Sequence, residues 1–206
     1  MRVGLLGGTF DPIHLGHLVI AEEARLRLGL DLVLFIPAGQ PPHKREEGVS
    51  PAADRLEMVR AAIGDHPGFS CSEVELLRPG ASYTVDTLAA LQAQYPQASL
   101  FWLLGTDSVT ELHTWHDPER LYRLATFVGL ARPGWSRREV DRWLADQPPD
   151  LRPRLEFVEI PLLDISSSAL RAALAAGGSV RYLAPDAVLA YAHAHGLYRG
   201  GGASDA

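Results

Sequence analysis

The chain has 206 residues, of which 47% are hydrophobic, enough to bury one substantial core without disulfides or a bound metal. Its 25 acidic residues outnumber the 19 basic ones, and the net charge of −6 argues against sequence-independent binding to nucleic acid or anionic membranes. The single cysteine, Cys71, excludes an intramolecular disulfide framework and a cysteine-rich zinc site, and it favours a reducing compartment such as the cytoplasm.

Short apolar runs alternate with helical patterns along the chain. The runs at residues 3–6, 32–36, 100–104, 127–130 and 157–160 have the length and composition of buried strands, and Cys71 is expected to be an ordinary strand residue. Two amphipathic stripes with spacings of three and four predict helices: Leu18, Ala21, Ala24 and Leu28, and then Leu56, Val59 and Ile63. Ser136 followed by Glu139 predicts a capping box that opens another helix.

This alternation predicts an α/β fold with a Rossmann-like, doubly wound parallel sheet, helices on both faces, and ligands at the carboxyl ends of the strands. We expect a single domain over residues 1–199, loops at 37–50 and 147–153, and a disordered tail at 200–206. The apolar run at the N-terminus is shorter than that of a signal peptide, and nothing in the sequence is long enough to span a membrane.

A glycine-rich segment joins the first predicted strand to the first predicted helix: Gly7-Gly8-Thr9-Phe10-Asp11-Pro12-Ile13-His14-Leu15-Gly16-His17. Glycines let the backbone approach a ligand, and a helix N-terminus offers free amides and a positive dipole end to phosphate. His14 and His17 share one face of the first helical turn, and Gly16 leaves that face unblocked. A His-x-x-His sequence on its own is more often a pair of surface or core histidines than a binding site. Here the preceding strand, the glycines and the following helix all fit a phosphate-binding segment, which favours the binding site.

The segment resembles the signature of the nucleotidyltransferase superfamily, in which a His-x-Gly-His sequence follows the first strand and binds the triphosphate of ATP or CTP. The matching residues are His14, Gly16 and His17. The resemblance also implies that ATP is contacted by the residues immediately before them, namely Gly7, Gly8, Thr9 and Phe10.

A second candidate phosphate site lies far downstream, at Asp164-Ile165-Ser166-Ser167-Ser168-Ala169-Leu170-Arg171. Serine hydroxyls and free amides open an alanine-rich helix there, with an arginine one turn further on. The alternative is that the serines only cap the helix and Arg171 lies on its solvated face. The segment looks like the superfamily's Ile-Ser-Ser-Thr-x-x-Arg motif, with Ser168 in place of threonine. By that resemblance the ATP-binding residues are Ile165, Ser166, Ser167 and Arg171.

Further segments are similar to one family within this superfamily, nicotinate mononucleotide adenylyltransferase. Gly105-Thr106-Asp107, followed by seven residues and Trp115, is similar to its Gly-Ala-Asp-x7-Trp pattern, with Thr106 in place of alanine. Residues 41–44, 82–87 and 180–186 match further segments of that family, so the resemblance covers nearly the whole chain.

The family resemblance implies a pyridine site beside the nucleotide site. Trp115 would stack on the ring, although a partly buried core tryptophan gives the same pattern. Thr84 would sit beside backbone amides, including that of His116, that hold the nicotinate carboxylate; the alternative is a helix cap. Gly105 and Asp107 would bind ATP, with Asp107 accepting from ribose hydroxyls, although a turn aspartate is the alternative. Lys44 and Arg132 would bind the mononucleotide through a phosphate, although a solvated loop lysine and an arginine beside a turn are the alternatives.

The activity that this resemblance implies is transfer of AMP from ATP to nicotinate mononucleotide, which forms nicotinate adenine dinucleotide and pyrophosphate in NAD biosynthesis. The nucleophile would be a phosphate oxygen that is already anionic, so positioning and charge stabilisation by His14, His17 and Arg171 would suffice. Mg²⁺ would enter with ATP, since it often binds through substrate phosphates and water. The expected partners are therefore these two nucleotides, without nucleic acid or membrane, and self-association is left open.

Three other functions share part of the pattern. A phosphopantetheine adenylyltransferase shares the first motif but would not explain Trp115 or Thr84. A class I aminoacyl-tRNA synthetase carries a similar histidine motif, but this chain lacks its length and a basic surface for tRNA. A nucleotide-sensing module would bind ATP without turning it over, and only an assay separates it from an enzyme.

Overall fold

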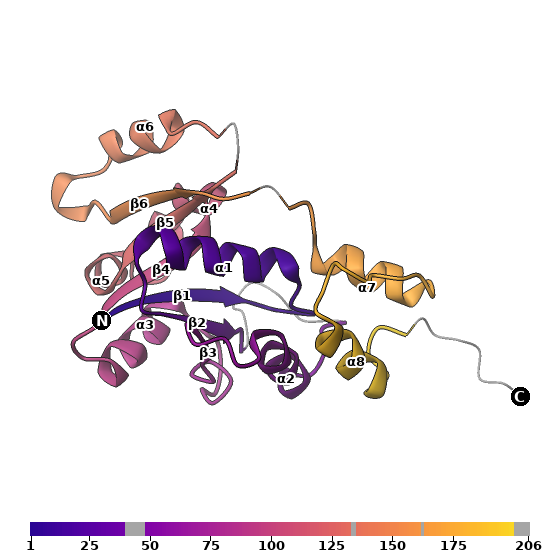
Figure 1. Cartoon of the computed structure of the whole chain (residues 1–206). Helices are drawn as coiled ribbons and strands as arrows, with labels where there is room; N and C mark the ends of the chain where they lie inside the picture. The colour runs from indigo at the N-terminus through magenta and orange to yellow at the C-terminus, as the bar shows by residue number, and fades with distance from the viewer. Residues whose placement is uncertain (40–47, 133–134, 162, 200–206) are drawn as a thin grey trace, which may run out of the picture.

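The computed structural model describes residues 1–39, 48–132, 135–161 and 163–199. In this part of the chain, six parallel strands form one sheet in the order β3-β2-β1-β4-β5-β6 (Figure 1). Their bounds are Arg2–Gly8 (β1), Leu32–Pro37 (β2), Phe69–Cys71 (β3), Ser99–Gly105 (β4), Thr126–Ala131 (β5) and Arg154–Glu159 (β6). This order confirms the predicted doubly wound, Rossmann-like α/β sheet.

Helices pack on both faces of the sheet. One face is covered by α1 (Leu15–Leu28) and α2 (Ala52–Ile63), with α8 (Asp186–Ala194) packed against α2, and the other face by α3 (Thr84–Gln94) and α5 (Pro118–Leu124). In β2, Val33 and Phe35 join the first core, whereas Leu34 and Ile36 join the second. Successive strand residues point to opposite faces, so burial on both sides explains why the strands are continuous apolar runs.

The strand order reverses between β1 and β4, which are neighbours in the sheet. The chain leaves β1 toward α1 and leaves β4 directly into α4 (Thr106–Val109). Helices α7 (Ser167–Ala175) and α8 lie beyond the carboxyl ends of the central strands (Figure 1). The predicted motifs therefore gather at the end of the sheet where folds of this kind bind ligands.

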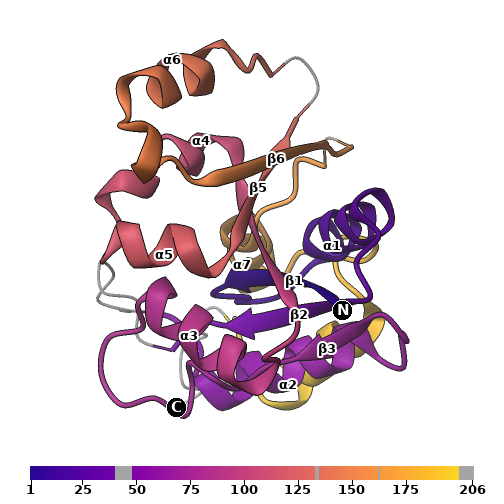
Figure 2. The same ribbon diagram turned by 90° about the vertical axis from the view of Figure 1, so that its left-hand side faces the viewer.

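Two predicted boundaries were wrong. The last strand covers Arg154–Glu159 rather than 157–160, because its extent follows its pairing with β5, in which Thr126 lies opposite Arg154. Helix α6 (Arg138–Asp146), which lies beyond β6 at this edge of the sheet (Figure 2), has Arg137 as its N-cap and no side-chain cap bond. The predicted capping box fails because the helix starts too late: Glu139 is its second residue, and the Ser136 hydroxyl accepts from the Arg138 N–H at 3.4 Å.

The remaining predictions of local structure are confirmed where the structure describes them. Both amphipathic stripes lie on helices that face the core, and Cys71 ends β3. The segment 147–153 is a connection that contains the short 3-10 helix Pro149–Leu151. Residues 40–47 of the first expected loop, and the expected tail at 200–206, lie outside the described residues.

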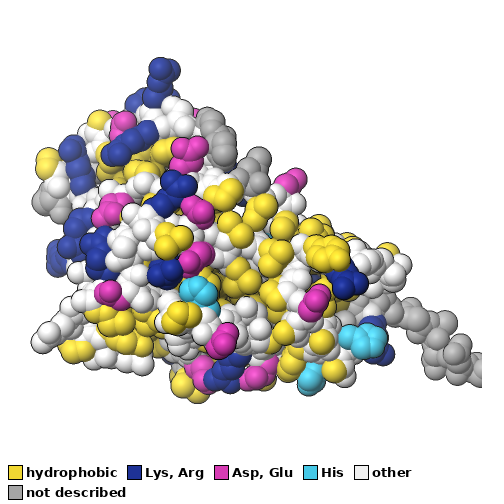
Figure 3. Space-filling view, in the orientation of Figure 1, with side chains coloured by type: hydrophobic (Ala, Val, Ile, Leu, Met, Phe, Trp, Pro, Cys, Tyr) yellow, Lys and Arg dark blue, Asp and Glu magenta, His cyan; other side chains and the backbone are white. Residues whose placement is uncertain are grey.

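The surface carries charges of both signs. On the face shown in Figure 3, acidic and basic side chains are interspersed. In the described ranges, no helix is long and apolar enough to cross a membrane.

Candidate functional site

The two histidines of the first motif stand at the start of α1. His14 is the N-cap of the helix and His17 is its third residue, and their rings stack with centroids 3.8 Å apart. The His14 backbone N–H donates to Nδ1 of His17 at 3.3 Å. Because Nδ1 of His17 accepts a hydrogen bond, the neutral ring carries its proton on Nε2, where it can be donated to a ligand.

Both histidines are neutral at pH 7 in the free protein. Burial lowers the pKa of His14 from 6.5 to about 4. Burial, followed by repulsion from His14, lowers the pKa of His17 from 6.5 to about 3. Two stacked rings cannot both carry a positive charge without a nearby anion, so the pair is suited to receive one.

Glycine is required between the histidines for a steric reason. A Cβ atom at Gly16 would lie 3.0 Å from Nδ1 and 3.1 Å from Cε1 of the His14 ring, closer than such contacts normally are.

The floor of this motif is apolar, since the buried Phe10 ring meets His17 edge-on at 5.0 Å. Phe10 is only 2% exposed, and it does not line the cleft described below. Gly7 and Gly8 are the last two residues of β1 rather than a separate turn.

The second motif opens α7 as the sequence predicted. Ser166 is the N-cap, and its hydroxyl accepts from the Ala169 N–H at 3.2 Å. The neighbouring Ser167 hydroxyl donates to the carbonyl of Pro12, in the first motif, at 2.9 Å. The serines thus cap the helix and also join the two motifs, since Ser167 and Pro12 are 155 positions apart in the sequence.

The two motifs line one cleft of about 340 Å³. From the first motif come His14, Gly16 and His17, and from the second Ile165, Ser166 and Ser167. Arg132, at the end of β5, lines the same cleft and adds a positive charge to it. Apolar walls complete the cleft, from Ile20, Ile160, Pro161 and Leu163. The arrangement offers hydrogen-bond donors and helix N-termini on one side, which suits phosphate, and apolar surface on the other.

Arg171 lies beside this cleft rather than in its wall. Its Nη1 donates to the backbone oxygen of Asp11 at 2.7 Å and lies 3.9 Å from Asp11 Oδ2. Its Nη2 donates to the Ser168 hydroxyl at 3.4 Å. The side chain is 32% exposed, so it is neither a freely solvated residue nor a fully buried one.

Sequence reasoning missed one residue that holds the strand ends in place. Arg55, on α2, is 1% exposed and donates to the carbonyls of Thr9, Ala38 and Ser50 at 2.9, 2.9 and 3.1 Å. It thereby connects the segments that leave β1 and β2 to the start of α2. A signal was present, because Arg55 lies four residues before Val59 and so falls on the apolar stripe of that helix.

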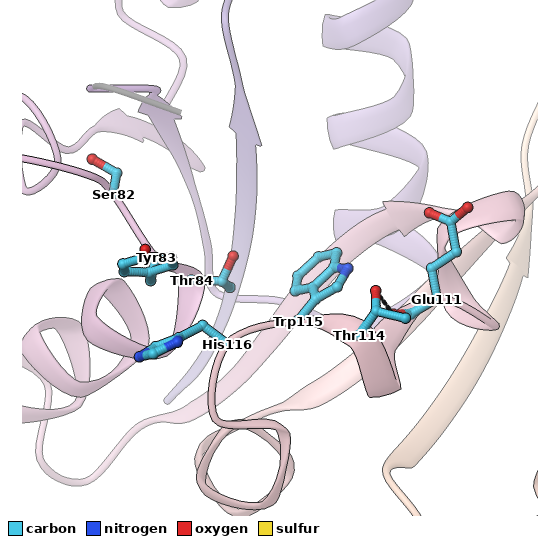
Figure 4. A pocket seen from close by; sticks show the side chains of 7 residues that line it. All are labelled: Ser82, Tyr83, Thr84, Glu111, Thr114, Trp115 and His116. Carbon is cyan, nitrogen blue, oxygen red and sulfur yellow. Dashed lines mark hydrogen bonds between the residues drawn. The ribbon is translucent and has the colours of Figure 1, made fainter. Parts of the chain in front are cut away.

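A second cavity, of about 290 Å³, contains the predicted pyridine site (Figure 4). Thr84, Trp115 and His116 line it together, and the indole of Trp115 lies across the gap from Thr84. The other lining residues are Ser82, Tyr83, Glu111 and Thr114.

Two details define the second cavity further. Thr84 is the first residue of α3 and Tyr83 its N-cap, so the alternative role of Thr84 as the cap is wrong. The His116 ring stacks on Tyr83 with centroids 4.3 Å apart, away from Trp115.

Other predicted site residues lie elsewhere. Asp107 lines a third cavity, of about 500 Å³, together with Thr106 and residues of α6 such as Arg138. Gly105 is the exposed N-cap of α4. Lys44 lies outside the described residues. No group of three or more His, Cys, Asp or Glu side chains that could hold a metal ion occurs in the part of the chain that the structure describes.

The sequence is similar to those of known proteins over most of its length. The family model Cytidylyltransferase-like matches residues 5–173. A probable nicotinate-nucleotide adenylyltransferase from Dehalococcoides mccartyi is 45% identical over 96% of this chain and 97% of its own length. One from Exiguobacterium sibiricum is 47% identical over 91% of this chain and 94% of its own.

The fold is shared with more distant proteins. A structure of Plasmodium falciparum nicotinic acid mononucleotide adenylyltransferase complexed with NaAD superimposes with a TM-score of 0.74, at 18% identity, over 96% of this chain and 97% of the other. Together with the relatives at 45% and 47% identity, these matches place the chain in a family. The chain belongs to the nicotinate-nucleotide adenylyltransferase family.

Proposed function

We propose that this chain transfers AMP from ATP to nicotinate mononucleotide, forming nicotinate adenine dinucleotide and releasing pyrophosphate, with residues 1–199 acting as one domain. The observation that carries the proposal is the convergence of two phosphate-binding motifs, at His14–His17 and Ser166–Ser167, on one cleft. The cavity that contains Trp115 supplies a separate place for an aromatic ring.

The triphosphate of ATP would lie in the cleft between the N-termini of α1 and α7. Helix amides and Nε2–H of His17 are donors there, and donors held in place stabilise charge that develops on a leaving group. The histidines enter as neutral donors, because burial keeps the pKa of each well below 7. As the anion approaches, its charge favours protonation of the rings, so their stabilising effect grows with the negative charge of the leaving pyrophosphate.

Arg132 and Arg171 would supply permanent positive charge. Arg132 lies in the cleft wall, and Arg171 lies one helical turn beyond the serines of α7. No side-chain nucleophile is needed, because the attacking phosphate oxygen of the mononucleotide is already anionic. The role of the protein is to hold the attacking and leaving oxygens in line.

The pyridine ring would occupy the cavity of Figure 4, stacked on Trp115. Thr84 is the first residue of α3, where backbone amides have no partner within the helix. These amides and that of His116 would bind the nicotinate carboxylate, which accepts from every donor. A carboxamide would place its own N–H against one of them.

Mg²⁺ would bind to the triphosphate and arrive with ATP. The donors that line the cleft fit phosphate oxygens, so coordination of the ion falls to the phosphates and water, as is common for Mg²⁺. Bound there, the ion would offset negative charge on the pyrophosphate. We place the reaction in the cytoplasm, where a chain with one cysteine, Cys71, meets reducing conditions.

One assay tests the proposal. The protein is mixed with ATP and Mg²⁺, and pyrophosphate release is measured separately with nicotinate mononucleotide, nicotinamide mononucleotide and phosphopantetheine. We expect sustained release with the first, with nicotinate adenine dinucleotide as the product. Release only with phosphopantetheine would assign the alternative adenylyltransferase activity, and ATP binding without release would indicate a nucleotide sensor.

A further inference from the structure

Asp11, the aspartate of the first motif, is a carboxylate buried at 1% exposure beside the proposed triphosphate site. A buried charge is costly unless donors surround it. Its Oδ1 accepts from the Tyr198 hydroxyl, and its Oδ2 accepts from the Ser50 N–H at 3.2 Å. Arg171 Nη1 lies 3.9 Å from the same Oδ2, longer than a hydrogen bond. Asp11 therefore joins three distant segments of the chain at one point.

The position of Arg171 depends on which groups donate hydrogen bonds to the Asp11 carboxylate. Its guanidinium is bound through Nη1 to the backbone oxygen of Asp11, not to the carboxylate. An arginine beside a carboxylate ordinarily forms short, often bidentate, hydrogen bonds with it. Here Tyr198 donates to Oδ1 and Ser50 donates to Oδ2, and the guanidinium forms no direct hydrogen bond with the carboxylate.

Tyr198 is well suited to donate a hydrogen bond to the Asp11 carboxylate. Burial, followed by its hydrogen bond to Asp11, raises the pKa of Tyr198, so its hydroxyl keeps the proton that it donates. Its backbone has a φ of 60°, a left-handed conformation that is unfavourable for a residue with a side chain. Such an outlier persists where the surroundings hold it, and here the contacts are with Asp11 and with Met58 Sδ at 3.7 Å.

We propose that Asp11 and Tyr198 are positioning residues: by occupying the carboxylate, Tyr198 keeps the Arg171 guanidinium available to the triphosphate. Without the hydroxyl, Asp11 Oδ1 loses its donor, and the carboxylate turns toward Arg171 and forms a direct ion pair. The positive charge is then neutralised within the protein, and ATP binds less tightly. This inference rests on the proposed function only in placing the triphosphate near Arg171.

The test is the dissociation constant of ATP, measured by isothermal titration calorimetry, which does not require turnover. Tyr198→Phe should weaken ATP binding about fivefold. The matched control is Tyr191→Phe, because Tyr191 lies on α8 and its hydroxyl donates to Asp54 at 2.9 Å, away from Arg171. The control should stay within twofold of the wild type. A Tyr198→Phe protein that binds ATP as the wild type does would overturn the proposal.

Two double variants separate positioning from a general loss of structure. In an Arg171→Ala background, Tyr198→Phe should change ATP affinity by less than twofold, because the group it protects is gone; the same fivefold loss would refute the mechanism. In Asp11→Asn/Tyr198→Phe, no carboxylate remains to capture Arg171, and affinity should return to within twofold of the wild type. Affinity that stays at the Tyr198→Phe value, or falls further, contradicts the proposal. If the wild-type protein binds ATP but forms no dinucleotide, the result contradicts the proposed function and not the positioning role of Tyr198.

Discussion

The histidine cleft and the Trp115 cavity are built in different ways. The cleft combines residues near both ends of the chain, such as His17 and Ser167, and it presents hydrogen-bond donors and positive charge. The Trp115 cavity uses two segments from the middle of the chain, 82–84 and 111–116, and its lining includes the aromatic side chains of Tyr83 and Trp115. In the proposed function, phosphate charge would therefore be bound where segments distant in sequence meet, whereas the pyridine ring would be bound between two segments that lie closer together in the sequence.

The largest effect should follow the loss of a donor in the histidine cleft. His17→Ala should keep the fold and lower kcat at least about a hundredfold, the scale of losing one held charge-stabilising group. His193→Ala, which removes an exposed histidine on α8, is the control and should change nothing. Steady-state kinetics and a thermal melt decide the point. A folded His17→Ala enzyme with more than half of wild-type turnover removes His17 from the mechanism.

The matching change in the other cavity is Trp115→Ala. Loss of ring stacking should raise KM for the mononucleotide about twentyfold, within the range measured for base stacking on aromatic side chains. The KM for ATP should stay within twofold, because Trp115 does not line the histidine cleft. Nicotinate and nicotinamide mononucleotides should be affected alike, since both share the ring. An equal rise in both Michaelis constants would mean that the two cavities do not work separately.

Selectivity between the two pyridines should be roughly tenfold or more in kcat/KM, in favour of nicotinate mononucleotide. An acceptor-only carboxylate matches the amides near Thr84 and His116, and leaving one donor unpaired costs about 1.5 to 3 kcal/mol. Both constants should be measured on one preparation. Equal values would indicate dual specificity, and a reversed ratio would contradict the assignment of these amides.

Substitution of Arg132 should also distinguish the two cavities, with a smaller change in KM. Its place in the histidine cleft predicts that Arg132→Ala raises KM for ATP about fivefold, typical of one exposed charge-assisted contact, with little change for the mononucleotide. Initial rates with each substrate varied in turn give both constants. A selective effect on the mononucleotide would instead place Arg132 with the pyridine site.

The smallest expected effect is on stability against pH. His14 has a pKa of about 4 in the folded protein, below its usual 6.5, so as pH falls below 6.5 the unfolded chain takes up a proton that the folded state does not. Stability is therefore lost between about pH 6.5 and 4. Between pH 7.5 and 5, the wild type should lose roughly 5 °C more in melting temperature than His14→Asn. Equal losses would mean that His14 is not buried as a neutral ring.

Most of the fold follows from local sequence patterns. Apolar runs alternating with amphipathic stripes are enough to predict a doubly wound parallel sheet, because strands buried on both faces and helices buried on one must pack in this way. The Ser166 cap and the shared face of His14 and His17 were also predictable, since each depends on residues within one helical turn.

One boundary that failed depends on strand pairing. The start of β6 at Arg154 follows from its register with β5, and as an edge strand it accepts polar residues that a search for apolar runs passes over. The start of α6 was misplaced for another reason: Arg137 is the N-cap, so Ser136 lies one residue before the cap and Glu139 is only the second residue of the helix.

By itself, the sequence determined the strand and helix alternation and the two motifs for which we propose phosphate binding, because those patterns depend on neighbours along the chain. Only the tertiary structure decided which motifs share a cavity, placing Arg132 with the histidines and Asp107 with α6. It alone revealed the Asp11–Tyr198 contact, between residues 187 positions apart. A hydrogen bond over that separation leaves no local pattern, since its geometry exists only once the helices on both faces have packed against the sheet.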